Sequence, residues 1–168
     1  MPINDISNLC KENNIYLHVD AVQAVGHIDI NIDNLGISSM SASAHKFNGP
    51  KGVGFLYISE KPKNLMFGGS QENGIRPGTE NVPGICSMAA ALSDSLKNLN
   101  EDQSNIMLMI NYLETELLKI KEVSLNCLNK DFHSILNFSI KNVSNEALIN
   151  YLDLQNICVS AGSACDGK

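Results

Sequence analysis

The residue most suited to chemistry in this sequence is a lysine between a run of small residues and a turn rich in glycine and proline. Lys46 follows His45 directly, Ser43 lies two residues before that histidine, and the turn spans residues 48–52. The apolar residues 53–58 predict a returning strand, which would hold Lys46 in a backbone corner where neighbouring donors point at one ligand. A surface lysine in a tight loop fits these residues equally well, so the motif alone leaves both interpretations open.

A carboxylate and an amide follow an upstream segment that has the periodicity of a strand. In Y-L-H-V-D-A-V-Q, at residues 16–23, apolar and polar side chains alternate. The alternation predicts a strand that delivers Asp20 and Gln23 at its end. A lone aspartate at such a place is usually a cap or turn residue. The carboxyl ends of parallel strands collect ligands in open α/β sheets, and Asp20 and residues 43–46 would lie there.

Four sequence blocks, in the family's order, resemble the class V family of pyridoxal-phosphate (PLP) enzymes, and within it the cysteine desulfurases of the NifS and IscS type. The blocks are D-A-V-Q at 20–23, S-A-H-K at 43–46, G-G-S-Q-E-N-G-I-R-P-G-T-E-N-V-P-G at 68–84 and S-A-G-S-A-C at 160–165. The resemblance implies an α/β fold, part of the large domain of a fold type I PLP-dependent transferase followed by a small α+β C-terminal domain. Residues 1–80 would belong to the PLP-binding domain and residues 81–168 to the small domain.

The resemblance assigns a role to each polar residue of the first two blocks. Lys46 would form the Schiff base with PLP and, once released, carry the substrate's Cα proton. Asp20 would pair with the pyridine nitrogen, and Gln23 would donate to the phenolate oxygen of the ring. Ser43 and His45 would bind the phosphate, together with backbone N–H groups of the turn.

Two residues of the glycine-rich block match the family less directly. Thr79 resembles the threonine that reaches across a two-fold interface to the phosphate of the neighbouring subunit, so a homodimer is expected. Alternatively, Thr79 or Asn81 caps the helix that follows. Arg76 is the only arginine of the chain, and it would either pair with substrate or shape its loop.

The cysteine loop supplies the second catalytic residue that the resemblance implies. Cys165 would take the sulfur of L-cysteine as a persulfide, leave L-alanine, and pass the sulfur to an iron-sulfur scaffold or another acceptor protein. Its small neighbours predict an exposed thiol, whereas Cys158 lies in a predicted strand and is expected to be buried and inert. Cys10, Cys86 and Cys127 sit in apolar patterns that favour packing.

Composition excludes several other classes of function. The 168 residues are 43% hydrophobic and 18% charged, as in a soluble globular protein, and the net charge of -6 argues against a nucleic-acid surface. No apolar run approaches the length needed to cross a bilayer, so a cytoplasmic protein is expected. Five cysteines, none of them spaced as C-x-x-C, predict neither a disulfide framework nor a metal site.

The remaining pattern predicts the elements that must position these residues. A helix at 1–13 leads into the first strand, and a short helix at 33–35 precedes the second strand. Residues 60–77 predict a functional loop, and helices are expected at 82–100 and 102–121. The last part predicts strands at 125–128, 135–140 and 157–160, with a helix at 146–155. The three histidines at positions 18, 27 and 133 are expected to be strand or surface residues.

Members of the resembling family are longer at both ends than this sequence. The ring-stacking residue, part of the phosphate cradle and the arginine that binds the substrate carboxylate have no counterpart here, so a fragment is expected and desulfurase activity would belong to the complete protein. Two alternatives remain open. One is another class V enzyme, such as a selenocysteine lyase or an aminotransferase, and the other is a truncated chain that only binds a partner or dimerises.

Overall fold

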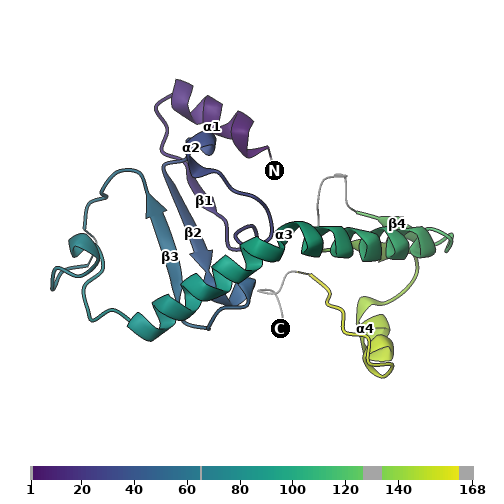
Figure 1. Ribbon diagram of the computed structural model, residues 1–168. Coiled ribbons are helices and arrows are strands. Elements are labelled where there is room, and N and C mark those ends of the chain that lie inside the picture. Colours follow the sequence, from purple (N-terminus) through teal and green to yellow (C-terminus); the bar gives the residue numbers. More distant parts are fainter. Residues whose placement is uncertain (1, 65, 127–133, 163–168) are drawn as a thin grey trace. The chain divides into compact units, whose positions relative to one another are not determined.

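A computed structural model describes residues 2–64, 66–126 and 134–162. The chain divides into two compact units, residues 1–103 and 104–168, and the division falls within its longest helix. The elements shown in Figure 1 are α1 (Ile3–Glu12), β1 (His18–Asp20), α2 (Ile32–Leu35), β2 (Ser39–Ser43), η1 (a 3₁₀ helix, Ala44–Phe47), β3 (Gly54–Ile58), η2 (a 3₁₀ helix, Glu72–Gly74), α3 (Val82–Leu117), β4 (Val123–Leu125), β5 (Phe138–Ile140) and α4 (Asn145–Asp153).

Unit 1 is built on a three-stranded sheet with the order β1-β2-β3. β1 runs parallel to β2, with Asp20 opposite Ser41, and β3 pairs antiparallel with β2. The connection from β1 to β2 passes through α2, as a parallel pair requires. The helices, strands and turn expected up to residue 58 are therefore confirmed as an α/β layer.

The short helix α2 is defined at both ends by local chemistry. The side chain of Asn31 caps its start by accepting a hydrogen bond from the Asn34 amide, and Gly36 ends it in the left-handed conformation. The buried Ser7 of α1 donates its hydroxyl to the carbonyls of Leu35 and Gly36. This contact docks α1 against the end of α2.

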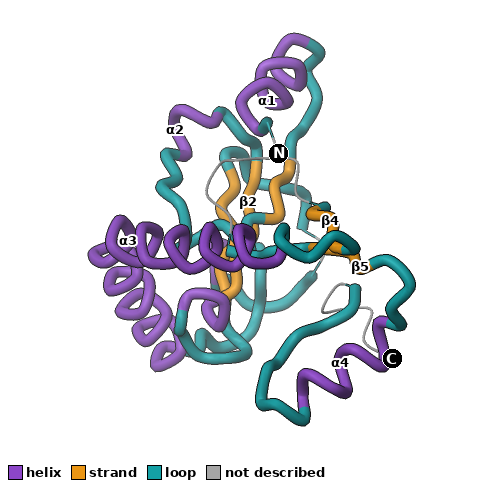
Figure 2. Tube along the Cα trace, turned by 90° about the vertical axis from the view of Figure 1, so that its right-hand side faces the viewer, coloured by secondary structure: helices purple, strands orange, loops and turns teal. Residues whose placement is uncertain are grey.

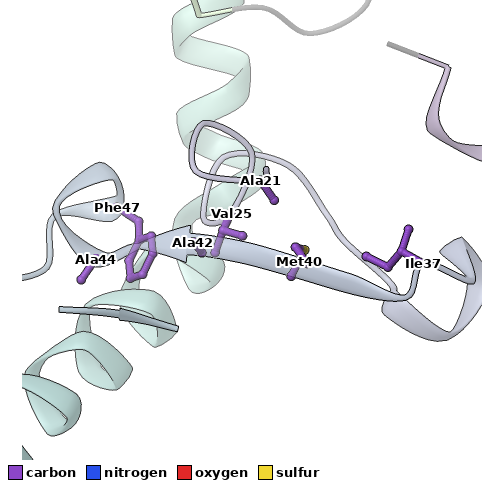
Figure 3. Packing of buried hydrophobic residues seen from close by; sticks show 7 residues of the cluster. All are labelled: Ala21, Val25, Ile37, Met40, Ala42, Ala44 and Phe47. Carbon is purple, nitrogen blue, oxygen red and sulfur yellow. The ribbon is translucent and has the colours of Figure 1, made fainter. Parts of the chain in front are cut away.

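One face of the sheet carries the core of unit 1. Met40 and Ala42 of β2 lie opposite Tyr57 and Phe55 of β3, and they pack with the fully buried Phe47. Figure 3 shows this row, with Ala21 and Val25 reaching it from the turn after β1. The buried members are Ala21, Val25, Ile37, Met40, Ala42, Ala44 and Phe47.

The opposite face of the same sheet is polar. Because side chains alternate along a strand, His18 and Asp20 of β1 share this face with Ser39, Ser41 and Ser43 of β2. Apart from Ser39, these side chains are exposed or half-buried. The sheet of unit 1 thus has one apolar face for packing and one face that reaches solvent, which is polar on β1 and β2 and carries the exposed Leu56 on β3.

The helix α3 is continuous, so the prediction of two helices meeting near residue 101 is wrong. The Asn-Glu-Asp sequence at 100–102 contains no glycine or proline, and nothing there interrupts the backbone hydrogen bonds. Met88, Ala91 and Leu92 of this helix pack on the core of unit 1. Across the described ranges, no helix is both long and apolar enough to span a membrane.

Cys86 is exposed, which contradicts the expected packing role, because it lies two residues before Met88 and therefore about 200° around the helix. The contact of α3 with the core also explains why unit 1 extends beyond residue 80. The domain division at residues 80 and 81 itself stays a prediction.

Unit 2 contains an antiparallel pair, β4 and β5, followed by α4 (Figure 2). Its buried hydrophobic side chains among the described residues are Ile110 and Val123. Ser144 caps α4 by accepting from the Ala147 amide. The expected strand at 157–160 is wrong, since these residues form no strand and Cys158 is exposed rather than buried. Alternating apolar side chains are not sufficient where no neighbouring strand supplies a ladder of hydrogen bonds.

The two faces of the unit 1 sheet predict different responses to truncation. Met40→Ala should lower the free energy of unfolding by about 2–5 kcal/mol, because it leaves a cavity in the core where Met40 is 3% exposed. The matched control is Leu56→Ala on the neighbouring strand, where Leu56 is 53% exposed and a loss of about 0.5 kcal/mol is expected. Urea denaturation measures both, and equal losses would contradict the assignment of the faces.

Candidate functional site

The predicted site residues of the first two sequence blocks lie at one edge of the unit 1 sheet. Asp20 is the last residue of β1, and Ser43 is the last residue of the parallel strand β2. The Ala21 amide donates to the Ser41 carbonyl at 3.0 Å, which continues the pairing past the strand end. Lys46 lies in η1 directly after β2, so the parallel pairing of β1 and β2 (Figure 1) brings the acid and the amine to the same edge of the sheet.

The turn that carries Lys46 is anchored from within. Ala44 and Phe47 are completely buried, whereas His45 is exposed and Lys46 is half-buried. Asn48 takes the left-handed conformation (φ 63°), which asparagine tolerates better than most residues, and closes η1 by donating its amide to the Ala44 carbonyl. The buried pair fixes the turn on the core and leaves His45 and Lys46 outside it.

The charged groups of the site are not used in ion pairs. Within the described part of the chain, neither Asp20 nor Lys46 forms a salt bridge. Asp20 is exposed, and its Oδ1 accepts from the Val22 amide at 3.0 Å, so it also serves the turn. Because no described residue forms a salt bridge with them, the exposed carboxylate and the half-buried amine can pair with a charged ligand.

Neutral donors complete this edge. Gln23 is exposed in the turn after β1, and Ser43 is half-buried at the end of β2 without capping η1. The set consists of an amine, a carboxylate, an amide, a hydroxyl and an imidazole. PLP needs an amine for its carbonyl carbon, an acid for its ring nitrogen and donors for its phosphate, so the residues present fit this cofactor.

His18 extends the polar face behind these groups. Its Nδ1 lies 2.7 Å from the hydroxyl of Ser39, and the hydroxyl of Ser41 lies 3.4 Å from its Nε2. His18 and Asp20 stand two residues apart and therefore point to the same face of β1. Its expected place in a strand is confirmed, and its serine contacts hold the imidazole on the face that presents Asp20.

His27 is the functional residue that sequence reasoning missed. It was expected in a strand or at the surface, yet it lies half-buried in a turn, and its Nε2 lies 2.7 Å from the Lys46 carbonyl oxygen. A carbonyl only accepts, so the imidazole must donate. The partner is a backbone atom 19 residues away, and a contact of that kind leaves no pattern in the sequence.

Gly26 allows the turn after β1 to approach η1 closely. Its φ is +81°, and a Cβ built on it would lie 2.6 Å from the Cβ of Phe47. Only glycine combines this conformation with this proximity. The turn of Gln23 is thereby packed against the residue that follows Lys46.

The glycine-rich loop shows how Arg76, Thr79 and Asn81 divide their roles. Nη1 of Arg76 donates to the carbonyls of Gly78 and Thr79. Arg76 therefore shapes its own loop, which was one of its two expected roles. The cap of α3 is Asn81, whose Oδ1 accepts from the Gly84 amide at 3.2 Å. Thr79 is exposed, and no hydrogen bond between described residues joins it to the Lys46 turn.

Cys165 lies outside the described residues, so its predicted role as a nucleophile stays a prediction. Cys10, Cys86 and Cys158 are free thiols.

Comparisons with known proteins match almost the entire chain. A family model described as Aminotransferase class-V covers residues 1–167. The cysteine desulfurase IscS of Dictyoglomus turgidum is 44% identical over an alignment of 171 positions, which covers 99% of this chain and 43% of that protein. The cysteine desulfurase IscS of Clostridium botulinum is 42% identical over 170 residues, with 98% and 43% covered.

Solved structures agree with these matches. The NifS-like protein from Rickettsia africae superposes with a TM-score of 0.87 at 32% identity, over 96% of this chain and 46% of that one. This chain therefore spans less than half the length of the curated relatives that it matches.

The close approach of Gly26 to Phe47 predicts that a side chain at position 26 lowers the stability by a steric clash, which a side chain at Gly52 would not cause. Gly26→Ala should destabilise the protein by more than Gly52→Ala, although both glycines have φ near +80°. Gly52 has no atom within 4 Å of a built Cβ, so its substitution costs only the left-handed conformation, about 1–2 kcal/mol. Thermal or urea unfolding of the two variants measures the difference, and equal stabilities would contradict the packing of Gly26 on Phe47.

Proposed function

This chain belongs to the aminotransferase class V family, and on that premise we propose that it serves in a PLP-dependent cysteine desulfurase. The reaction converts L-cysteine to L-alanine and passes the sulfur on as a persulfide. Relatives that match nearly the whole chain at 44% and 42% identity carry the name cysteine desulfurase, which supports this activity over others of the family.

The observation that carries the proposal is the shared edge of β1 and β2. A carboxylate at the end of one strand and an amine just after its parallel neighbour are the two groups that a pyridine ring with a carbonyl substituent needs on its opposite sides. Both are without salt bridges in the part of the chain that the structure describes.

When bound, PLP supplies an electron sink that stabilises negative charge on the substrate's Cα. Lys46 would hold the cofactor through its Nζ and, once displaced by substrate, would remove the Cα proton and return one later. Asp20 would keep the ring nitrogen protonated, because a nearby carboxylate favours the charged form of that nitrogen. Val22, which donates its amide to Oδ1, holds the carboxylate in place for this task.

The neutral donors would orient the cofactor. Ser43 and His45 flank the start of η1 and would bind the phosphate with their side chains, assisted by free backbone N–H groups of the turn. Gln23 would donate its amide to the phenolate oxygen. Such positioning keeps the reacting atoms aligned, and an error of 1 Å costs about a hundredfold in rate.

Cys165 would accept the sulfur. Its thiolate attacks the sulfur of the bound cysteine, the Cβ–S bond breaks, and the substrate carbon skeleton leaves as alanine after protonation. Atoms balance, since one cysteine and one thiol become one alanine and one persulfide. The persulfide would then be delivered to an iron-sulfur scaffold or another sulfur-acceptor protein, and five cysteines in no disulfide spacing fit the reducing cytoplasm.

We also propose a homodimer, in which Thr79 reaches the phosphate of the neighbouring subunit. Its hydroxyl is exposed and Asn81 already caps α3, so the side chain of Thr79 is left for another partner. Residues 1–80 would then belong to the PLP-binding domain, and residues 81–168 would form the small α+β domain that carries the cysteine loop.

The two catalytic residues predict separable defects in the complete protein. Lys46→Ala should abolish the visible absorption band of lysine-bound PLP and lower desulfuration at least about a hundredfold. Cys165→Ser should keep that band but form no persulfide after addition of L-cysteine. Absorption spectroscopy and mass spectrometry with a thiol-reactive probe measure the two effects.

Cys158→Ser is the matched control, because Cys158 is an exposed thiol seven residues away. It should form the persulfide normally. If Cys165→Ser released alanine from cysteine at the rate of the unmodified protein, the role of Cys165 as the sulfur acceptor would be overturned. If the complete protein took up no PLP, the proposal of an enzyme would be overturned in favour of a binding or dimerisation role.

A trans role of Thr79 predicts complementation between two inactive variants. In a mixed dimer of Lys46→Ala and Thr79→Ala chains, one site would receive Lys46 from one chain and Thr79 from the other, and so would be intact. Mixing the two proteins under conditions of subunit exchange should restore up to about a quarter of the unmodified activity. About half of the dimers would then be mixed, and each mixed dimer would have one intact site out of two. Activity that stays at the level of the separate variants would mean that Thr79 acts within its own subunit.

A further inference from the structure

We propose that His27 is a positioning residue for Lys46, which couples the lysine-bearing turn to the turn that carries Asp20 and Gln23. The inference rests on the proposed function, in that Lys46 is taken as the cofactor lysine. Its physical basis is a single contact, the imidazole Nε2 at 2.7 Å from the Lys46 carbonyl oxygen.

The Lys46 carbonyl needs such a donor because of where it lies. η1 is a single 3₁₀ turn of four residues, and the last carbonyls of a short helix have no partner within it. His27 supplies the donor for Lys46, and the Ser95 hydroxyl, 3.4 Å from the Phe47 carbonyl, supplies a weaker one for the next residue. Two consecutive carbonyls are thus held by side chains from two different elements.

His27 is itself held from the other side. The side-chain Nε2 of Gln103 donates to the His27 carbonyl at 2.7 Å. Gly26, the residue directly before His27, packs against Phe47. The imidazole is half-buried, which limits competition from water for its donor. Nε2 donates in the neutral tautomer that carries its hydrogen on Nε2, and it also donates in the imidazolium.

The consequence concerns the span between amine and acid. PLP would contact Lys46 and Asp20 on opposite sides of one rigid ring, so the two backbones must keep a constant separation. The turn that follows Asp20 reaches His27 seven residues later. The imidazole of His27 then connects this turn to the Lys46 carbonyl. Without this link, the Lys46 carbonyl would lose its side-chain donor, and the peptide that orients Nζ would be held less firmly.

The test uses the complete protein with His27 replaced by Phe, which keeps a flat ring without the donor, and by Gln, whose Nε2 retains a donor at similar reach. Amide hydrogen exchange of residues 44–49, measured without cofactor, should accelerate at least about tenfold in His27→Phe and stay within about threefold of wild type in His27→Gln. The PLP dissociation constant should rise at least about tenfold in His27→Phe only. His27→Leu replaces the Phe variant if that ring is not accommodated.

Gln103→Met is the matched control, because it removes the bond to the His27 carbonyl and leaves the imidazole in place. Its exchange at residues 44–49 and its PLP affinity should change less than in His27→Phe, because the imidazole keeps its bond to the Lys46 carbonyl. Unchanged exchange in His27→Phe would overturn the inference, and so would equal losses in the Phe and Gln variants, which would assign His27 to packing. A wild-type protein without PLP would overturn the proposed function, while the exchange comparison would still decide whether His27 holds the Lys46 peptide.

Discussion

Parallel pairing of β1 with β2 is the constraint on which the rest of the site depends. Asp20 and Lys46 are 26 positions apart in the sequence. They reach one edge because both strands run in the same direction, and β2 ends two residues beyond the pair of Asp20 and Ser41. An antiparallel arrangement of the same strands would send the acid and the amine to opposite edges. The α2 crossover is what permits the parallel direction.

The alternation of β2 assigns its two faces to different tasks. Met40 and Ala42 join the core, whereas Ser39, Ser41 and Ser43 form the polar face. The turn after β2 continues this division, since Ala44 and Phe47 are buried and His45 and Lys46 are not. Burial of Phe47 therefore has a functional consequence, because it anchors the turn that presents the lysine. Stability and chemistry are supplied here by neighbouring residues of one short segment.

The differences between expectation and structure share one physical cause. The break expected near residue 101 was inferred from a change in apolar stripe, but a helix ends only where its backbone hydrogen bonds are interrupted. The strand expected at 157–160 had the right side chains and no partner strand among the described residues. Cys86 was judged by its apolar neighbours in sequence, while its exposure follows from the face of α3 that meets the core. Each error concerns what lies beside a segment in space.

The amino-acid sequence by itself determined the strand ending at Asp20, the small-residue turn around Lys46, the returning strand and the family to which these motifs belong, because each depends on side-chain periodicity or on a contiguous block. Tertiary structure alone decided that His27 contacts the Lys46 carbonyl and that Gly26 makes room for Phe47. These contacts join backbone atoms and side chains from separate elements. Residue types do not encode them, since any donor brought to the same place would serve, and only the fold decides which donor arrives there.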